Sequence, residues 1–100
     1  MPVIVDPEGI SVKIIQEFVD FTGKRVLEIG CGKGRITMAI AERSSHITAI
    51  DPLAEDIQTA KQNTPDPLKG IINFIASSIQ DFNLPEGSAK FDIALFSWSL

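Results

Sequence analysis

The stretch that decides the fold is Val26-Leu27-Glu28-Ile29-Gly30-Cys31-Gly32-Lys33-Gly34. It begins as a short apolar strand over residues 25–29 and passes into a glycine loop. A helix with Ile36, Ala39 and Ile40 on one side is predicted to follow the loop. Glycine permits a tight turn there and lets a ligand approach the backbone without a Cβ in the way. A strand, a glycine loop and a helix in this order form a βα unit.

A second unit of the same kind follows the first. Residues 47–50 predict a second apolar strand, and the next segment predicts a helix that carries Leu53, Ile57 and Ala60. Parallel strands joined by helical crossovers form a sheet covered on both faces, so each strand is expected to be an almost continuous apolar run. The sequence therefore predicts an α/β fold, a doubly wound and mostly parallel sheet with helices on both faces.

The two ends of the chain extend this pattern. Residues 7–21 predict a first helix, with Asp6 as its cap. After a proline-broken loop over residues 63–70, strands are predicted over residues 71–75 and 91–96. No strand is predicted before the first helix.

Length and composition indicate one domain over residues 1–100, because 100 residues with 44% hydrophobic content suit a single core. The fourth predicted strand lies close to Leu100, with no helix to cover it and no partner for its outer edge. An open apolar edge is an aggregation hazard. We therefore expect a further C-terminal half, of which this chain is the N-terminal part, or a homo-oligomer in which another subunit pairs with that edge.

Charge and composition exclude several classes of function. Thirteen acidic and nine basic residues give a net charge of -4, which disfavours nucleic acid as the main partner. No apolar run reaches the ~18 residues that a membrane-spanning helix needs, and no basic segment marks a signal peptide. The lone cysteine, Cys31, suits a reducing compartment, and the single histidine, His46, disfavours metal catalysis. We expect a cytoplasmic protein without a metal site.

An acidic residue, Asp51, ends the second predicted strand, 21 positions after Gly30. A carboxylate about 20 residues beyond a glycine loop typically accepts hydrogen bonds from ribose hydroxyls. Loop and acid together favour a nucleotide-ligand site over a structural turn.

Two residues discriminate among nucleotide ligands. A dinucleotide-binding loop has its third glycine where this chain has Arg35. Glu28 is placed at the end of a buried strand, where a carboxylate is costly unless a cation or hydrogen-bond donors neutralise it. An ammonium or sulfonium ligand would relieve that cost, which favours S-adenosylmethionine over a pyrophosphate dinucleotide. A lysine or backbone N–H partner for Glu28 is the structural alternative.

Residues 26–34 resemble the first motif of class I S-adenosylmethionine-dependent methyltransferases, and Asp51 matches their second motif. The resemblance covers residues 24–100 and implies a Rossmann-like domain with S-adenosylmethionine as its cofactor. It implies that Glu28 and the loop backbone hold the methionine part, that Asp51 binds the ribose, and that the next residues contact the adenine. The cofactor-binding set it implies is Glu28, Gly30, Cys31, Gly32, Gly34, Asp51, Pro52, Leu53, Ser78, Ile79 and Ser97.

Ser78 departs from the family pattern, which often has an acid near this position that accepts from the adenine amino group. A serine hydroxyl can also accept a hydrogen bond, or the contact passes to Asp81. No catalytic residue is assigned, because methyl transfer mainly requires alignment of the acceptor and exclusion of water. His46 is expected in a surface loop away from the site, Cys31 to be a small loop residue, and Asp92 to satisfy neighbouring backbone groups.

The methyl acceptor is expected to be a small molecule. Residues 96–99 read Phe-Ser-Trp-Ser, whereas family members that methylate amide or base nitrogens often carry an Asn-Pro-Pro-Tyr-like string there. The proline-cysteine pair of cytosine C5 enzymes is absent as well. Trp98 either lines the acceptor pocket or serves as hydrophobic cover.

Three other functions remain open on the sequence alone. One is a non-catalytic S-adenosylmethionine-binding module or partner subunit, and another is an NAD-dependent oxidoreductase with the same βαβ arrangement. The third is an aminopropyltransferase that uses decarboxylated S-adenosylmethionine, because fold-level analogy does not distinguish it from a methyltransferase.

Overall fold

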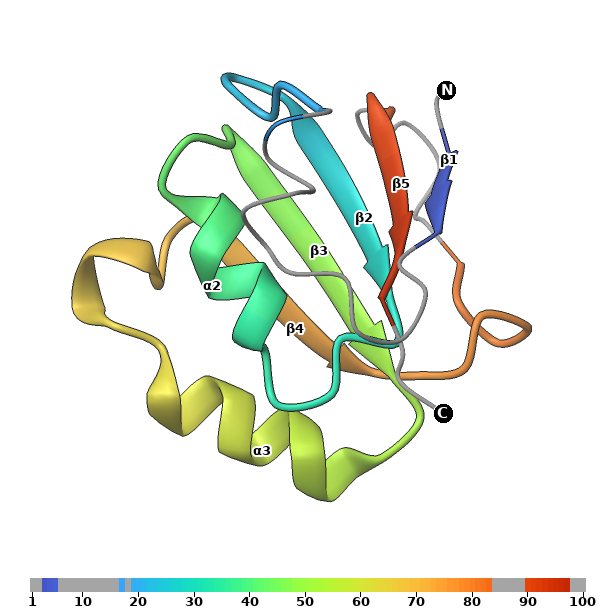
Figure 1. Ribbon diagram of the computed structural model, residues 1–100. Coiled ribbons are helices and arrows are strands. Elements are labelled where there is room, and N and C mark those ends of the chain that lie inside the picture. The colour runs from blue at the N-terminus through green and yellow to red at the C-terminus, as the bar shows by residue number, and fades with distance from the viewer. Residues whose placement is uncertain (1–2, 6–16, 18, 84–89, 98–100) are drawn as a thin grey trace.

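The chain forms one sheet of five parallel strands with helices packed against it (Figure 1). The computed structural model describes residues 3–5, 17, 19–83 and 90–97. The strands are β1 (Val3–Val5), β2 (Arg25–Ile29), β3 (His46–Asp51), β4 (Ile72–Ala76) and β5 (Ile93–Phe96). The helices are α2 (Arg35–Ala41), α3 (Ala54–Asn63) and the short 3-10 helix η1 (Asp66–Leu68). The predicted α/β fold class with a parallel sheet is confirmed.

The strand order in the sheet is β1-β5-β2-β3-β4, so β2 and β3 lie inside it. Every residue of these two strands after the first is buried, as expected for strands covered on both faces. The edge strand β4 instead alternates between buried and more exposed positions. The predicted strand positions were correct to within two residues at each end.

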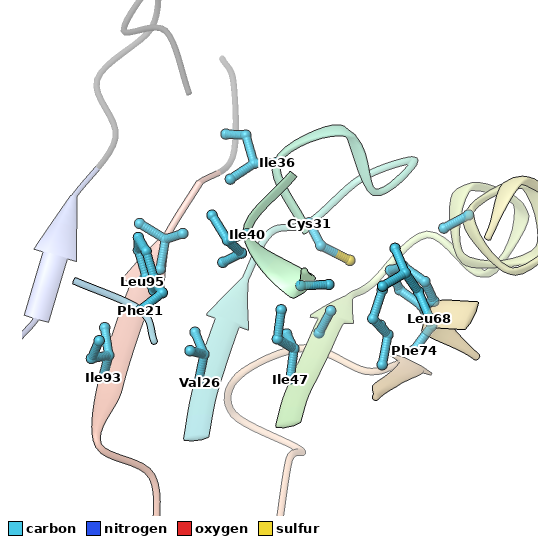
Figure 2. Packing of buried hydrophobic residues seen from close by; sticks show 14 of the residues in the cluster. Phe21, Val26, Cys31, Ile36, Ile40, Ile47, Leu68, Phe74, Ile93 and Leu95 are labelled. Carbon is cyan, nitrogen blue, oxygen red and sulfur yellow. The ribbon is translucent and has the colours of Figure 1, made fainter. Parts of the chain in front are cut away.

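Helices α2 and α3 pack on the same face of the sheet. Ile40 of α2 and Ile57 of α3 belong to one cluster of buried residues with Val26 and Ile47 of the strands. In Figure 2 the side chains of Val26 and Ile47 project from the sheet toward Ile40. A smaller cluster around Leu27, Ile29 and Ile50 covers the opposite face, and Phe82, Phe91 and Phe96 pack against it.

The outer edge of β5 is paired, contrary to the expectation of an open edge. Val3 of β1 lies opposite Ala94, and Val5 lies opposite Phe96, in a parallel ladder. The sequence signal that was missed is the β-branched run of residues 3–5, which has the composition of a strand. Most of the helix predicted over residues 7–21 lies outside the described residues.

Three details of the helices differ from the sequence prediction. The buried residues of α2 are Ile36, Thr37, Ile40 and Ala41, so Thr37 is buried, whereas Ala39, which was expected on the apolar side, is only partly buried. Leu53 precedes α3 and is exposed, so it does not belong to the apolar face of that helix. The predicted loop over residues 63–70 contains the short helix η1. Leu68, the last residue of η1, is buried in the core. Within the described part of the chain, no helix has the length and apolar character to cross a membrane.

Gly34 joins the glycine loop to α2 at a place where only glycine fits. Its φ is +88°, and a Cβ there would lie 3.0 Å from Phe74 Cζ, 3.2 Å from Met38 Cε and 3.3 Å from Ala60 Cβ. Its N–H donates to the carbonyl oxygen of Cys31 at 3.0 Å. The missing side chain therefore lets the start of α2 lie close to Phe74 of β4 and Ala60 of α3.

We predict that Gly34→Ala lowers the free energy of unfolding by about 2 kcal/mol or more, because it adds overpacking to left-handed backbone strain. Gly23→Ala isolates the strain, since Gly23 has φ +69° and a Cβ there would meet nothing within 4 Å. Gly70→Ala, without a positive φ or a nearby atom, should change stability by no more than about 1 kcal/mol. Urea unfolding measures all three, and an equal loss in Gly34→Ala and Gly23→Ala would contradict the packing argument.

Candidate functional site

The carboxyl ends of the central strands meet at one edge of the sheet. Ile29 at the end of β2 lies opposite Ile50 of β3 and Phe96 of β5. The chain passes from β2 outward through β3 to β4, and β5 then lies on the other side of β2. Ligands of open α/β sheets bind where the strand order reverses in this way. The predicted loop, Asp51 and Ser97 are therefore brought to this edge.

The glycine loop uses its N–H groups inside the protein. The amides of Gly30 and Cys31 both donate to the carbonyl oxygen of Ile50, at 2.9 and 3.1 Å. The amide of Gly32 donates to Asp51 Oδ2 at 2.9 Å. Because each carbonyl oxygen has two lone pairs, the loop backbone retains more capacity to accept hydrogen bonds from a ligand than to donate them.

Gly32 is the open position of the loop. Its φ is +54°, which L side chains rarely adopt, and a Cβ there would meet nothing within 4 Å. The backbone at Gly32 is thus accessible to a ligand, whereas Gly34 faces the core.

Asp51 connects β3, the glycine loop and the start of α3. Its side chain is 8% exposed, and Oδ2 accepts the Gly32 N–H while Oδ1 accepts the Leu53 N–H at 2.9 Å. A carboxylate has about four lone-pair positions, so these two bonds leave capacity for hydroxyl groups of a ligand. The two backbone bonds also hold the carboxylate in one orientation.

Glu28 is completely buried at the end of β2. Its Oε1 accepts a hydrogen bond from the hydroxyl of Thr37, and its Oε2 accepts one from the hydroxyl of Ser97. Ser97 Oγ also lies 3.4 Å from the carbonyl oxygen of Gly30. The sequence alternative was a lysine or backbone N–H partner, and the structure shows hydroxyl partners from α2 and from the end of β5.

Thr37 is the site residue that the sequence analysis missed. It lies three residues before Ile40 and therefore on the apolar side of α2. A polar residue within that apolar face, together with a buried carboxylate in need of donors, is the signal that was available.

Two apolar side chains remain exposed beside the site. Leu53 is 60% exposed and Ile79 is 45% exposed, and they are the large hydrophobic residues found exposed among those described. The Ser77 N–H donates to the carbonyl oxygen of Asp51 at 3.0 Å, which holds the segment after β4 next to the end of β3. Pro52, another predicted site residue, is also exposed.

The structure brings Ser78 and Asp81 together. The Ser78 hydroxyl donates to Asp81 Oδ2 at 3.0 Å, and the Asp81 N–H donates to Ser78 Oγ at 3.2 Å. The serine that departs from the family pattern therefore has a carboxylate beside it.

The residues set aside in the sequence analysis lie elsewhere or have other tasks. His46 is not in a loop but is the first residue of β3, opposite Arg25, at the amino edge of the sheet. Partial burial, and then the charge of Arg25, lower the pKa of His46. Asp92 Oδ2 accepts the Arg25 N–H at 2.9 Å, which confirms its role toward the backbone. Trp98 lies outside the described residues.

This geometry agrees with the comparison to known families. The model of the methyltransferase domain family matches residues 26–100. The chain belongs to this family. The match begins within β2 and includes the glycine loop, Asp51 and the end of β5, which are the parts of the candidate site.

Relatives of this methyltransferase domain include enzymes that are named for small molecules. The chain is 36% identical over 62 residues to a magnesium-protoporphyrin O-methyltransferase of Rhodobacter capsulatus, which covers 62% of this chain and 28% of the relative. It is 34% identical over 84 residues to a ubiquinone biosynthesis O-methyltransferase of Xylella fastidiosa. That match covers 83% of this chain and 33% of the relative. The chain thus spans about a third of the length of these relatives or less.

A solved structure with the same fold is magnesium protoporphyrin IX methyltransferase from Synechocystis PCC 6803 with bound S-adenosylhomocysteine. It has a TM-score of 0.66 and 17% identity, over 85% of this chain and 37% of that one. The predicted membership of the S-adenosylmethionine-dependent methyltransferases and the predicted Rossmann-like fold are confirmed. Family membership also supports S-adenosylmethionine as the cofactor.

Cys31 lies within the loop but is a poor nucleophile. Its side chain is 7% exposed, and its thiol contacts the carbonyl oxygen of Gly32 at 3.7 Å. Burial raises the pKa of the Cys31 thiol far above its usual range, and the negative charges of Glu28 and Asp51 raise it further. The thiolate form is therefore strongly disfavoured at neutral pH.

We predict that a thiol reagent such as Ellman's reagent labels native Cys31 about a hundredfold or more slowly than the chain unfolded in urea, because the thiolate is the reacting form. Absorbance at neutral pH follows the reaction, and Cys31→Ser provides the blank. Equal rates in the native and unfolded chains would show that the thiol is accessible and ionised.

Proposed function

We propose that this protein is an S-adenosylmethionine-dependent methyltransferase that transfers a methyl group to a small-molecule acceptor. The observation that supports it most directly is the hydrogen-bonding state of the site. The loop amides of Gly30, Cys31 and Gly32 donate inside the protein, and two carboxylates, Glu28 and Asp51, lie next to the loop. Such a site favours a cationic ligand.

A pyrophosphate does not suit this arrangement. Anion-binding loops present free N–H groups to phosphate oxygens, whereas these amides already donate to Ile50 and Asp51. A second negative charge next to buried Glu28 would also be repelled. Lys33 and Arg35 are exposed, where solvent and salt screen their charge. The geometry therefore disfavours a dinucleotide and favours a ligand with an ammonium or sulfonium centre.

The residues present fit the rest of S-adenosylmethionine as well. Asp51 retains lone pairs for the ribose hydroxyls, and exposed Leu53 and Ile79 provide apolar surface for an adenine ring. The Ser78 hydroxyl, which already donates to Asp81, retains capacity to accept from an amino group. These groups support the proposed contacts to the ribose and to the adenine.

The role of the chain in the reaction follows from these contacts. The bound cofactor supplies a methyl group activated by a sulfonium centre. The loop carbonyls orient the methionine part, the negative charge of buried Glu28 attracts its ammonium group, Asp51 fixes the ribose, and Ser97 lies at the end of β5 beside the loop. Alignment of this kind is the main requirement of an in-line displacement. No general base is assigned.

The acceptor is proposed to be a small molecule because the relatives are named as O-methyltransferases of magnesium-protoporphyrin and of ubiquinone biosynthesis. Hydroxyl and carboxyl compounds are therefore the first acceptors to test.

We further propose that residues 1–100 form one cofactor-binding domain, located in the cytoplasm, where a buried free thiol such as Cys31 remains reduced. The pairing of β1 with β5 removes the argument for a second subunit at that edge.

We predict that calorimetric titration shows micromolar binding of S-adenosylmethionine and none of NADH. Asp51→Asn should weaken the binding about tenfold or more, because an NH2 donor replaces one oxygen acceptor of the carboxylate and the negative charge is lost. The matched control is Asp66→Asn, since Asp66 is an exposed carboxylate that forms an ion pair with Lys69 and lies outside the site. Its affinity should equal that of the wild-type chain.

The outcomes of this titration separate the alternatives. NADH binding without S-adenosylmethionine binding would contradict the proposal and indicate an oxidoreductase. Preference for decarboxylated S-adenosylmethionine would indicate an aminopropyltransferase. Binding without release of S-adenosylhomocysteine in the presence of hydroxyl and carboxyl acceptors, measured on a chain as long as the relatives, would indicate a non-catalytic module.

A further inference from the structure

The least exposed polar side chains of the described structure are bonded to each other. Glu28 and Thr37 are both 0% exposed, whereas the other buried polar residues retain between 5% and 8% of their surface. One lies at the end of the central strand β2, and the other lies on the face of α2 that packs on the sheet. Thr37 donates its hydroxyl hydrogen to Glu28 Oε1.

Thr37 differs in this respect from other buried hydroxyl residues near helices. The hydroxyls of Ser44 and Thr64 each donate to the carbonyl oxygen four residues earlier, at 2.9 and 2.8 Å. That local bond is the common solution for a buried serine or threonine at a helix. Thr37 instead donates across the interface between α2 and β2, to a carboxylate at the ligand edge.

We propose that Thr37 is a positioning residue of the cofactor site, acting through Glu28. This inference rests on the proposed binding of S-adenosylmethionine. With Thr37 at Oε1 and Ser97 at Oε2, both oxygens of the carboxylate are held by hydroxyl donors from different elements. The plane of the carboxylate is therefore set by the helix on one side and by the end of β5 on the other.

The physical effect of Thr37 on the ligand is twofold. A hydrogen bond to a charged acceptor favours the ionised carboxylate in a buried place, where ionisation would otherwise be costly. Fixing its orientation also removes the need to order Glu28 when a cationic group binds next to it. Loss of the hydroxyl should therefore weaken binding of a cationic ligand even though Thr37 does not contact it.

The test compares three variants at position 37 by calorimetric titration with S-adenosylmethionine. Thr37→Val keeps the shape of the side chain but removes the donor, and it should weaken binding about tenfold or more. Thr37→Ser keeps the donor and should bind within about threefold of the wild-type chain. Thr37→Ala, which adds no new contact, takes the place of Thr37→Val if that variant does not fold.

Two controls separate positioning from a loss of stability. Thr64→Val also removes a buried hydroxyl, but one that donates to the Ala60 carbonyl oxygen of its own helix, so it should lower the unfolding midpoint without changing the dissociation constant. In a Glu28→Gln background, Thr37→Val should weaken binding by less than about twofold further, because the two residues act as one unit.

Several results would overturn the inference. These are wild-type affinity in Thr37→Val, a loss in Thr37→Ser as large as in Thr37→Val, or an equal loss in Thr64→Val. If the wild-type chain does not bind S-adenosylmethionine at all, the proposed function itself fails and the inference fails with it. Normal wild-type binding combined with any of the first three results refutes the role of Thr37 alone.

Discussion

The parallel register of β5, β2 and β3 is the constraint on which the site depends. Ile29 lies opposite both Ile50 and Phe96, so the residues that follow these strands emerge at the same level of the sheet. A shift of β2 by one residue against its neighbours would turn its side chains to the opposite face of the sheet, and Glu28 would no longer face α2. Burial of both faces of β2 and β3 makes such a shift costly, so the apolar core also maintains the geometry of the ligand edge.

The carboxylate of Glu28, which is buried between β2 and α2, is costly for stability. Replacing Glu28 by an apolar residue of similar volume would relieve the desolvation, whereas removing only one of its partners would leave a charge with fewer donors. The chain retains the carboxylate and surrounds it with hydroxyl groups from Thr37 and Ser97. Such an arrangement is expected where a binding requirement, rather than packing, determines the residue. Asp51 shows the same pattern with backbone N–H donors.

Local patterns in the sequence were sufficient for most of the architecture and failed where distant segments meet. The β2, loop and α2 unit was predicted because its apolar period and glycines are contiguous. The pairing of β1 with β5 was missed, since residues more than 90 positions apart carry no local signal of their contact. His46 was assigned to a loop because a polar residue at a strand end resembles loop composition, although Arg25 opposite it completes the ladder.

The sequence by itself determined the alternation of strands and helices, the glycine loop and the acid that ends β3, because hydrophobic period and residue spacing act over short range. It also indicated a cationic ligand through Glu28. The tertiary structure alone decided which groups donate to that carboxylate and that the amides of Gly30, Cys31 and Gly32 already donate within the protein. Those bonds join β2 to α2, β3 and the end of β5. Only the packed sheet brings these elements within hydrogen-bonding distance, so no pattern within one segment could reveal them.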